Sequence, residues 1–265
     1  MLEGDASTGS GSHAGTRPAV AFPLDATLGV DGLPQSGTGQ TTLLTGENGA
    51  ALHGSHFGPW IPVRLRPLVE ERSLLRRAVT AGISSAFANA YPADWPAGGR
   101  RRVAGPPLAA RGAGLLTRRH SDLRDRGAVA SEIVNDGWRR WAGPDAVPEV
   151  SAREAGVILA EIASAHRLTF FAHYSTDTAG HRGGMDGSVG ALERVDTFLA
   201  GVLDRLPANR TLMVVSDHGN IEDVRGGHTR NPALGLLVGP EARERARELD
   251  GLGDIAPRAL DWLSA

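Results

Sequence analysis

Short apolar segments alternate with amphipathic segments along most of this chain, and this alternation limits the folds open to it. Residues 168–174 and 211–215 are apolar runs of strand length, and each is followed by polar, turn-forming sequence. Apolar side chains recur at helical spacing in residues 151–166 and 190–206. Strands that alternate with helices are typical of α/β domains. The sequence therefore predicts an α/β fold with three layers, α/β/α, around a central, mostly parallel sheet.

The chain is predicted to form one domain behind a leader. Residues 1–18 are rich in Gly, Ser and Thr, so we expect them to be disordered. Residues 19–265 carry the strand and helix patterns, and their length suits a single large α/β domain. Residues 92–148 are rich in Pro, Gly, Ala and Arg. We expect this stretch to be a loop-rich insertion in the domain.

Composition removes several classes of function. The chain has no cysteine, which excludes disulfides, thiolate metal sites and Cys nucleophiles. All 28 basic residues are arginine, so no mechanism can use a lysine. The net charge of −2 gives no sign of a nucleic-acid partner. No apolar run reaches the roughly 18 residues that cross a membrane, and no secretory signal is visible, so a cytoplasmic location is expected. The sequence gives no indication of the oligomeric state.

Acidic and imidazole side chains follow two predicted strands. The motif STDTAGH places Asp177 and His181 after one strand, and SDHGN places Asp217 and His218 after the other. His228 follows ten residues later. Ligands bind beyond the carboxyl ends of strands in open parallel sheets, and carboxylates with imidazoles bind divalent metals. Asp and His are also common turn residues, but five together predict a site for two metals about 3.5–4 Å apart.

A candidate nucleophile lies near the N-terminus of the domain. Ser36 follows a predicted turn and opens a predicted helix at residues 38–44. A helix N-terminus offers free N–H groups to a phosphate, and a nearby metal can activate the hydroxyl. The alternative is that Ser36 only caps this helix. The surrounding glycines resemble a phosphate-binding loop of nucleotide hydrolases, but that loop requires a lysine, which this chain lacks.

Three segments carry a resemblance to a known family: LPQSGTGQTTLLTGENG at 33–49, STDTAGH at 175–181 and SDHGNIEDVRGGHTRNP at 216–232. They resemble the metalloenzyme domain shared by cofactor-independent phosphoglycerate mutases and phosphopentomutases, which belongs to the alkaline phosphatase superfamily. The resemblance spans roughly residues 20–260 and implies an alkaline-phosphatase-like fold. It also implies that the metal ligands fall into two sets: Asp177, His181 and His228 for one ion, and Asp217, His218 and the Ser36 oxygen for the other.

The resemblance further implies that Ser36 is transiently phosphorylated and that the substrate is a small phosphorylated molecule. So many imidazoles suit Zn²⁺ or Mn²⁺ better than Mg²⁺. Asn48 is a weaker candidate, either as a donor to a phosphoryl oxygen or as a helix C-cap.

The chain departs from the family in two places. The family's domain begins with a strand ending in Asp-Gly, whose Asp binds a metal, and no equivalent is found ahead of Ser36, which indicates an N-terminally shortened member. The mutases also carry a large domain that encloses the substrate, and residues 92–148 are too short to supply it. We therefore expect a phosphatase or phosphodiesterase. The alternatives are a metal- or phosphate-binding protein without turnover, and a phosphomutase acting on a sugar phosphate or phosphoglycerate.

Overall fold

The computed structural model of the chain describes residues 17–96 and 102–264. Apart from Arg17 and Pro18, the predicted leader lies outside these residues. The strands are β1 (Ala19–Leu24), β2 (Ser85–Phe87), β3 (Leu168–Phe170), β4 (Leu212–Val215) and β5 (Ala233–Val238). The helices are α1 (Ser36–Thr45), α2 (Gly49–His53), α3 (Arg66–Arg72), α4 (Leu74–Thr80), α5 (Gly105–Gly112), α6 (His120–Arg124), α7 (Asp136–Ala142), α8 (Ala152–Ser164), α9 (Ser175–Arg182), α10 (Gly184–Arg205), α11 (Ala242–Ala246) and α12 (Leu252–Ser264), with a 3-10 turn at Val63–Leu65.

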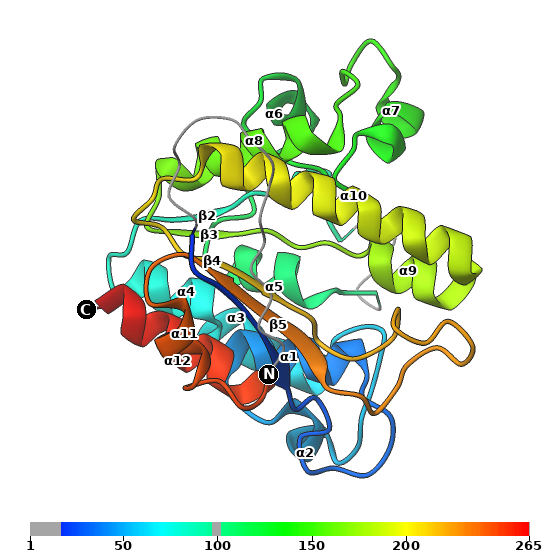
Figure 1. Ribbon diagram of the computed structural model, residues 1–265, viewed down its shortest axis with the longest axis vertical. Coiled ribbons are helices and arrows are strands. Elements are labelled where there is room, and N and C mark those ends of the chain that lie inside the picture. The colour runs from blue at the N-terminus through cyan, green and yellow to red at the C-terminus, as the bar shows by residue number, and fades with distance from the viewer. Residues whose placement is uncertain (1–16, 97–101, 265) are drawn as a thin grey trace.

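The strands form two sheets. The larger has the order β1-β5-β4, and the smaller pairs β2 with β3 (Figure 1). The β2–β3 pair is parallel, whereas β5 runs antiparallel to both of its neighbours. The α/β class is thus confirmed, but the pairing is mixed rather than mostly parallel. Only a loop connects β4 to β5, and a parallel return would need a crossover of a dozen or more residues, usually a helix.

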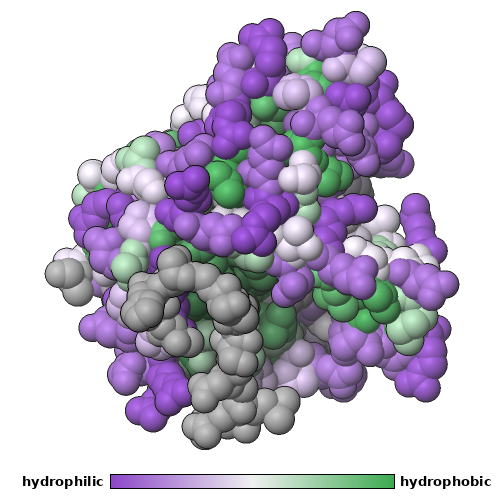
Figure 2. Space-filling model, turned by 45° about the horizontal axis from the view of Figure 1, so that its top comes forward, coloured by the Kyte–Doolittle hydropathy of each residue, from purple (hydrophilic) through white to green (hydrophobic). Residues whose placement is uncertain are grey.

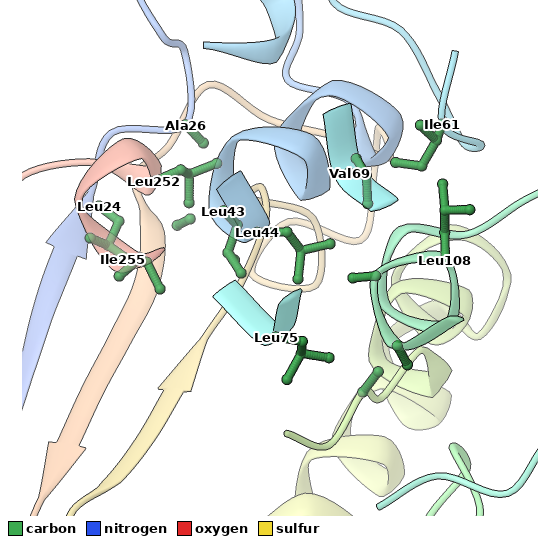
Figure 3. Close-up of a cluster of buried hydrophobic side chains, with 14 of the residues drawn as sticks. Leu24, Ala26, Leu43, Leu44, Ile61, Val69, Leu75, Leu108, Leu252 and Ile255 are labelled. Carbon is green, nitrogen blue, oxygen red and sulfur yellow. The ribbon is translucent and has the colours of Figure 1, made fainter. Parts of the chain in front are cut away.

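Helices cover both faces of the strands, which confirms the predicted three layers. Successive side chains of a strand point to opposite faces. In β2, Phe87 packs into a core cluster with α1, α3, α4, α5 and α12, whereas Ala86 belongs to a second cluster with α8 and α10. Figure 3 shows part of the first cluster, in which Leu43 and Leu44 of α1 lie between the strands and α5. The segments that carry the predicted site residues are α1, α9 and the loop after β4, and they lie at the same end of the strands (Figure 1).

Several helices differ from the sequence prediction in their ends. The amphipathic pattern over residues 66–81 is split into α3 and α4 at Ser73, whose hydroxyl accepts a hydrogen bond from the backbone N–H of Arg76 and caps α4. The sequence of residues 131–141 predicts a helix, but α7 begins only at Asp136. Within residues 92–148, α5 contributes Leu108 to the larger core cluster, while α6 and α7 pack over a small cluster of their own. No described helix has the length and apolar character needed to cross a membrane.

Candidate active site

Three segments far apart in the sequence, α1, α9 and the loop between β4 and β5, bring the predicted site residues together. Asp177 lies in the first turn of α9, directly after β3, and His181 lies one turn further along the same helix. Asp217 and His218 follow β4. His228 comes from the loop between β4 and β5, and Ser36 is the first residue of α1. All six side chains therefore meet at one edge of the fold, as the motifs predict.

One carboxylate oxygen is the centre of the cluster. Oδ1 of Asp177 lies 3.4 Å from Nε2 of His181, 3.6 Å from Nε2 of His228 and 3.7 Å from Nε2 of His218. The ligand atoms of Asp177, His218 and His228 all lie within 4.8 Å of one another. Oδ1 of Asp217 is 3.6 Å from Nε2 of His218. Three imidazoles and two carboxylates that converge in this way form a donor set suited to a divalent cation.

The ring orientation of two histidines leaves one nitrogen of each free to bind a metal. Nδ1 of His228 lies 2.7 Å from the carbonyl oxygen of Pro34, and Nδ1 of His218 lies 3.2 Å from that of Gly219. A carbonyl on one ring nitrogen holds the proton there and directs the lone pair of the other nitrogen towards the metal. In both rings the nitrogen left over is Nε2, the atom that faces Asp177. The residues therefore fit a bound metal.

The contact between Asp177 and His228 shifts the pKa of both groups. Burial would raise the pKa of Asp177, but the contact with His228 and the charges on His218 and His181 outweigh it and keep this pKa below its usual value. Burial would lower the pKa of His228, but Asp177 and the Pro34 carbonyl outweigh it and raise this pKa. The site thus holds a carboxylate that stays negative and attracts cations.

Ser36 is placed against this cluster by tight packing of α1. Its Oγ lies 2.9 Å from Nε2 of His218, and the residue is buried. A Cβ at Gly37 would overlap the carbonyl oxygen of Trp60, and one at Gly39 would lie 2.6 Å from that of Asp217. Gly39 therefore lets the first turn of α1 approach Asp217, and Gly37 lets it pack against the backbone of Phe57 and Trp60. The N-cap is Gln35, so Ser36 does not cap the helix.

Two amide side chains donate hydrogen bonds to the carboxylates of the site, and neither had a role predicted from the sequence. Nδ2 of Asn220 donates to Oδ1 of Asp177 at 2.9 Å, and Nε2 of Gln40 donates to Oδ2 of Asp217 at 3.0 Å. The other end of Gln40 accepts a hydrogen bond from the N–H of Gly105 at the start of α5. The i, i+4 spacing of Gln40 from Ser36 on one helix face was the available signal.

Glu222 connects the two parts of the β4–β5 loop that carry His218 and His228. Its carboxylate accepts hydrogen bonds from the backbone N–H of Asn220 at 2.7 Å, from the Thr229 hydroxyl, and from the Asn231 amide at 3.1 Å. The first lies two residues after His218 and the second is next to His228. Glu222 therefore fixes the relative position of two metal-ligand candidates.

Asn48 does not join the cluster. Its Nδ2 donates to the carbonyl oxygen of Leu28, and its Oδ1 accepts from the N–H of Ala51, as the N-cap of α2. Both polar ends of the side chain are thus engaged by the fold, and the residue begins one helix rather than ending another. Asn48 is therefore not part of the proposed site.

The C-terminal part of the chain is similar to known proteins. Residues 144–265 match the family described as the Metalloenzyme superfamily, which confirms the resemblance carried by the motifs at 175–181 and 216–232. The 2,3-bisphosphoglycerate-independent phosphoglycerate mutase of Desulforudis audaxviator is 34% identical over 128 residues, which cover 45% of this chain and 25% of the mutase. That of Rhodopseudomonas palustris is 35% identical over 128 residues, covering 44% of this chain and 25% of the mutase.

The match spans about a quarter of the length of these relatives. Among solved structures, one titled "Structure of PH0037 protein from Pyrococcus horikoshii" aligns with a TM-score of 0.46 and 17% identity, over 71% of this chain and 44% of that chain.

Proposed function

We propose that the protein transfers phosphoryl groups between small phosphorylated molecules and Ser36, with divalent metals held by the Asp/His cluster. The observation that carries this proposal is the position of the Ser36 hydroxyl, 2.9 Å from Nε2 of His218 at the mouth of a carboxylate–imidazole cluster. Bound Zn²⁺ or Mn²⁺ supplies Lewis acidity, which favours the ionised hydroxyl and offsets charge on the phosphoryl oxygens. Two ions suit the number of ligands.

The residues of the chain perform the remaining steps. Oγ of Ser36 attacks phosphorus, an Oγ–P bond forms, the P–O bond to the leaving alcohol breaks, and the proton lost from Ser36 ends on the oxygen of that alcohol. Ser36 is the first residue of α1, so the positive end of the helix dipole favours an anionic phosphoryl group on its Oγ. Asn220 and Gln40 keep the two carboxylates oriented throughout. In a second step the phosphoryl group leaves Ser36 for a hydroxyl of the substrate or for water.

The acceptor in that second step distinguishes two reactions. The relatives are named phosphoglycerate mutases, and this favours return of the phosphoryl group to a substrate hydroxyl, with a phosphoglycerate as the substrate. Release to water is favoured by the small size of the segment at 92–148. Its described part contributes three short helices, whereas the mutases carry a large domain that encloses the substrate. Because the relatives are named mutases, transfer to a substrate hydroxyl is our first proposal and hydrolysis is our second.

One assay separates these reactions. The protein is loaded with Mn²⁺ or Zn²⁺ and incubated with 3-phosphoglycerate, and phosphorus NMR follows 2-phosphoglycerate and inorganic phosphate; p-nitrophenyl phosphate serves as a general hydrolysis substrate. We expect Ser36→Ala to abolish turnover and Ser164→Ala to retain it, because Oγ of Ser164 only bonds the carbonyl of Ala160 within α8. Full metal-dependent turnover by Ser36→Ala would remove Ser36 from the nucleophile role.

A non-catalytic role remains the contrasting proposal. A protein that holds metal through Asp177 and His228 without turnover would bind Zn²⁺ and yet form no product from either phosphoglycerate. The feature that motivates it is the missing Asp-Gly pair: a strand, β1, does precede Ser36, but Asp25-Ala26 follows it, and Oδ1 of Asp25 accepts hydrogen bonds from Thr27. Metal binding with no phosphorylation of Ser36 under any substrate would favour this role.

A further inference from the structure

A second cavity lies apart from the candidate active site. The larger cavity, of about 1180 Å³, lies between β3 and β4 and contains Ser36 and Asp217, so it belongs to the fold and to the site described above. Figure 2 shows hydrophobic residues in this hollow, ringed by hydrophilic ones. The second cavity holds about 240 Å³, and no residue lines both. Its described lining includes Pro92, Trp95, Arg111, Gly114, Leu116 and Arg119.

The main chain sets the position of this second cavity. The N–H of Tyr91 donates to the carbonyl oxygen of Arg118 at 3.0 Å, which joins the segment after β2 to the loop after α5. The N–H of Trp95 donates to the carbonyl oxygen of Pro92 at 3.1 Å and closes a turn. Gly114 has a φ of +73°, and a Cβ there would meet no atom within 4 Å. The cavity therefore stays open at Gly114.

Arg111 is held at one side of the cavity and keeps one nitrogen free. Its Nε and Nη2 both donate to Oε1 of Glu70, at 3.0 and 2.8 Å. Its guanidinium carbon lies 5.6 Å from the centroid of the Trp95 ring, within the range of a cation–π contact. Nη1 makes no hydrogen bond with the described residues. A guanidinium fixed by two partners thus leaves its third nitrogen for a ligand.

Arg119 is held in a similar way by the other part of the lining. Its Nη1 donates to the carbonyl oxygens of Arg118 and Tyr91, at 3.0 and 3.5 Å. Nε and Nη2 make no hydrogen bond with the described residues. Oδ2 of Asp122 accepts the backbone N–H of Arg119 at 2.7 Å, but neither Asp122 nor Glu70 lines the cavity. The described lining therefore offers free guanidinium donors and no carboxylate to satisfy them.

We propose that this cavity binds a small organic oxyanion, with its charged oxygens on Arg119 and Arg111 and its apolar part against Trp95 and Leu116. The Nε/Nη2 edge of Arg119 can donate two parallel hydrogen bonds to a carboxylate, a phosphonate or a phosphate ester, and Nη1 of Arg111 adds another. The volume lies below the roughly 300–1,000 Å³ of most ligand pockets, so the ligand is smaller than a nucleotide. The site uses neither metal nor Ser36 and is independent of the proposed phosphoryl transfer.

Calorimetric titration of the full chain with benzoate, phenylphosphonate and benzamide tests this inference. The first two join an oxyanion to a compact ring, and benzamide is a neutral molecule of nearly the same shape as benzoate. A chelator removes divalent metal, so the Asp/His cluster holds no cation that could bind an anion. We expect one or both anions to bind, and benzamide to bind about tenfold or more weakly, because it lacks charge-assisted hydrogen bonds. The preferred anion distinguishes a carboxylate ligand from a phosphorus oxyanion.

Three variants test whether the anion binds in this cavity. Arg119→Gln should weaken anion binding about tenfold or more, because it removes the Nε/Nη2 edge. Arg124→Gln is the matched control on α6, since Arg124 bonds the exposed Asp125 and does not line the cavity. The anion should also change the indole fluorescence of the protein, and this change should disappear in Trp95→Phe.

Four results would overturn the proposal: no binding of either anion at millimolar concentration, equal binding of benzamide, equal affinity of Arg119→Gln and Arg124→Gln, or a fluorescence change that persists in Trp95→Phe. The comparison of the anions with benzamide uses the unmodified chain, so it stands even if Arg119→Gln fails to fold. Because the titration involves no metal and no turnover, its failure is distinguishable from a failure of phosphoryl transfer at Ser36.

Discussion

Gly180 of α9 lies where the helix meets Asn220, and adding one methyl group there perturbs the site in a calculable way. A Cβ at this position would overlap Oδ1 of Asn220 and lie 2.8 Å from its Cγ and 3.2 Å from Cα of Ile221. Asn220 would have to move, although its Nδ2 donates to Asp177 at 2.9 Å. Gly180→Ala therefore couples helix packing to the orientation of the central metal-ligand candidate.

The magnitude follows from three contributions. Ala in place of Gly in a helix interior stabilises by about 1 kcal/mol. Overpacking costs about 1–3 kcal/mol, and loss of a hydrogen bond to a charged group costs about 1.5–3 kcal/mol. We expect Gly180→Ala to lower the free energy of unfolding by about 1.5–5 kcal/mol. In an Asn220→Ala background the overlap and the hydrogen bond are already gone, so the same change should stabilise by up to about 1 kcal/mol.

Urea unfolding of the four proteins of this double-mutant cycle, followed by circular dichroism, measures the coupling between positions 180 and 220. The reasoning predicts that the effect of Gly180→Ala changes sign between the two backgrounds. Gly190 provides the control, because a Cβ there meets no atom within 4 Å, so Gly190→Ala should stabilise in both backgrounds. Equal destabilisation by Gly180→Ala with and without Asn220 would refute the proposed contact.

Three further outcomes test other parts of the structure. Asn89→Leu should lower the free energy of unfolding by about 2–6 kcal/mol, because Asn89 satisfies both the N–H and the C=O of Ala172; a loss under 1 kcal/mol in urea would contradict this. Gln40→Leu should weaken Zn²⁺ binding about 10–100-fold in calorimetric titration, since Asp217 loses its donor; unchanged affinity would refute that role. Zn²⁺ at 100 times its Kd should stabilise by about 2.7 kcal/mol, and Asp177→Asn should remove most of this effect.

The parts of the site that consist of residues close together in the sequence could be predicted from the sequence. Asp177 and His181 are one helical turn apart, and Asp217 and His218 are adjacent, so each pair is visible as a short motif next to an apolar run. The convergence of the pairs follows from the rule that strand ends meet at one edge of a sheet. The residues that orient the carboxylates were not predictable in this way. The i, i+4 spacing of Gln40 from Ser36 places it near the site, but Gln40 lies 177 positions from Asp217 and this spacing does not indicate which carboxylate it contacts.

The pairing of the strands was harder to predict than their existence. The apolar runs around β3 and β4 are visible in the sequence, but the direction of a strand depends on the connection that leads into it. Residues 216–232 form a loop occupied by the Asp/His motif, so β5 returns antiparallel. Similarly, leucines continue at helical spacing through Ser73, and only the capping hydrogen bond to the N–H of Arg76 shows that a new helix starts there.

The central claim is that the Asp/His cluster holds divalent metal beside Ser36, and anomalous diffraction from crystals grown with Zn²⁺ tests it most directly. The account predicts two anomalous peaks about 3.5–4 Å apart. Each should lie within bonding distance of Asp177 or Asp217, and one should be next to the Ser36 hydroxyl. Well-ordered zinc elsewhere on the protein, with no peak among Asp177, His218 and His228, would contradict the account.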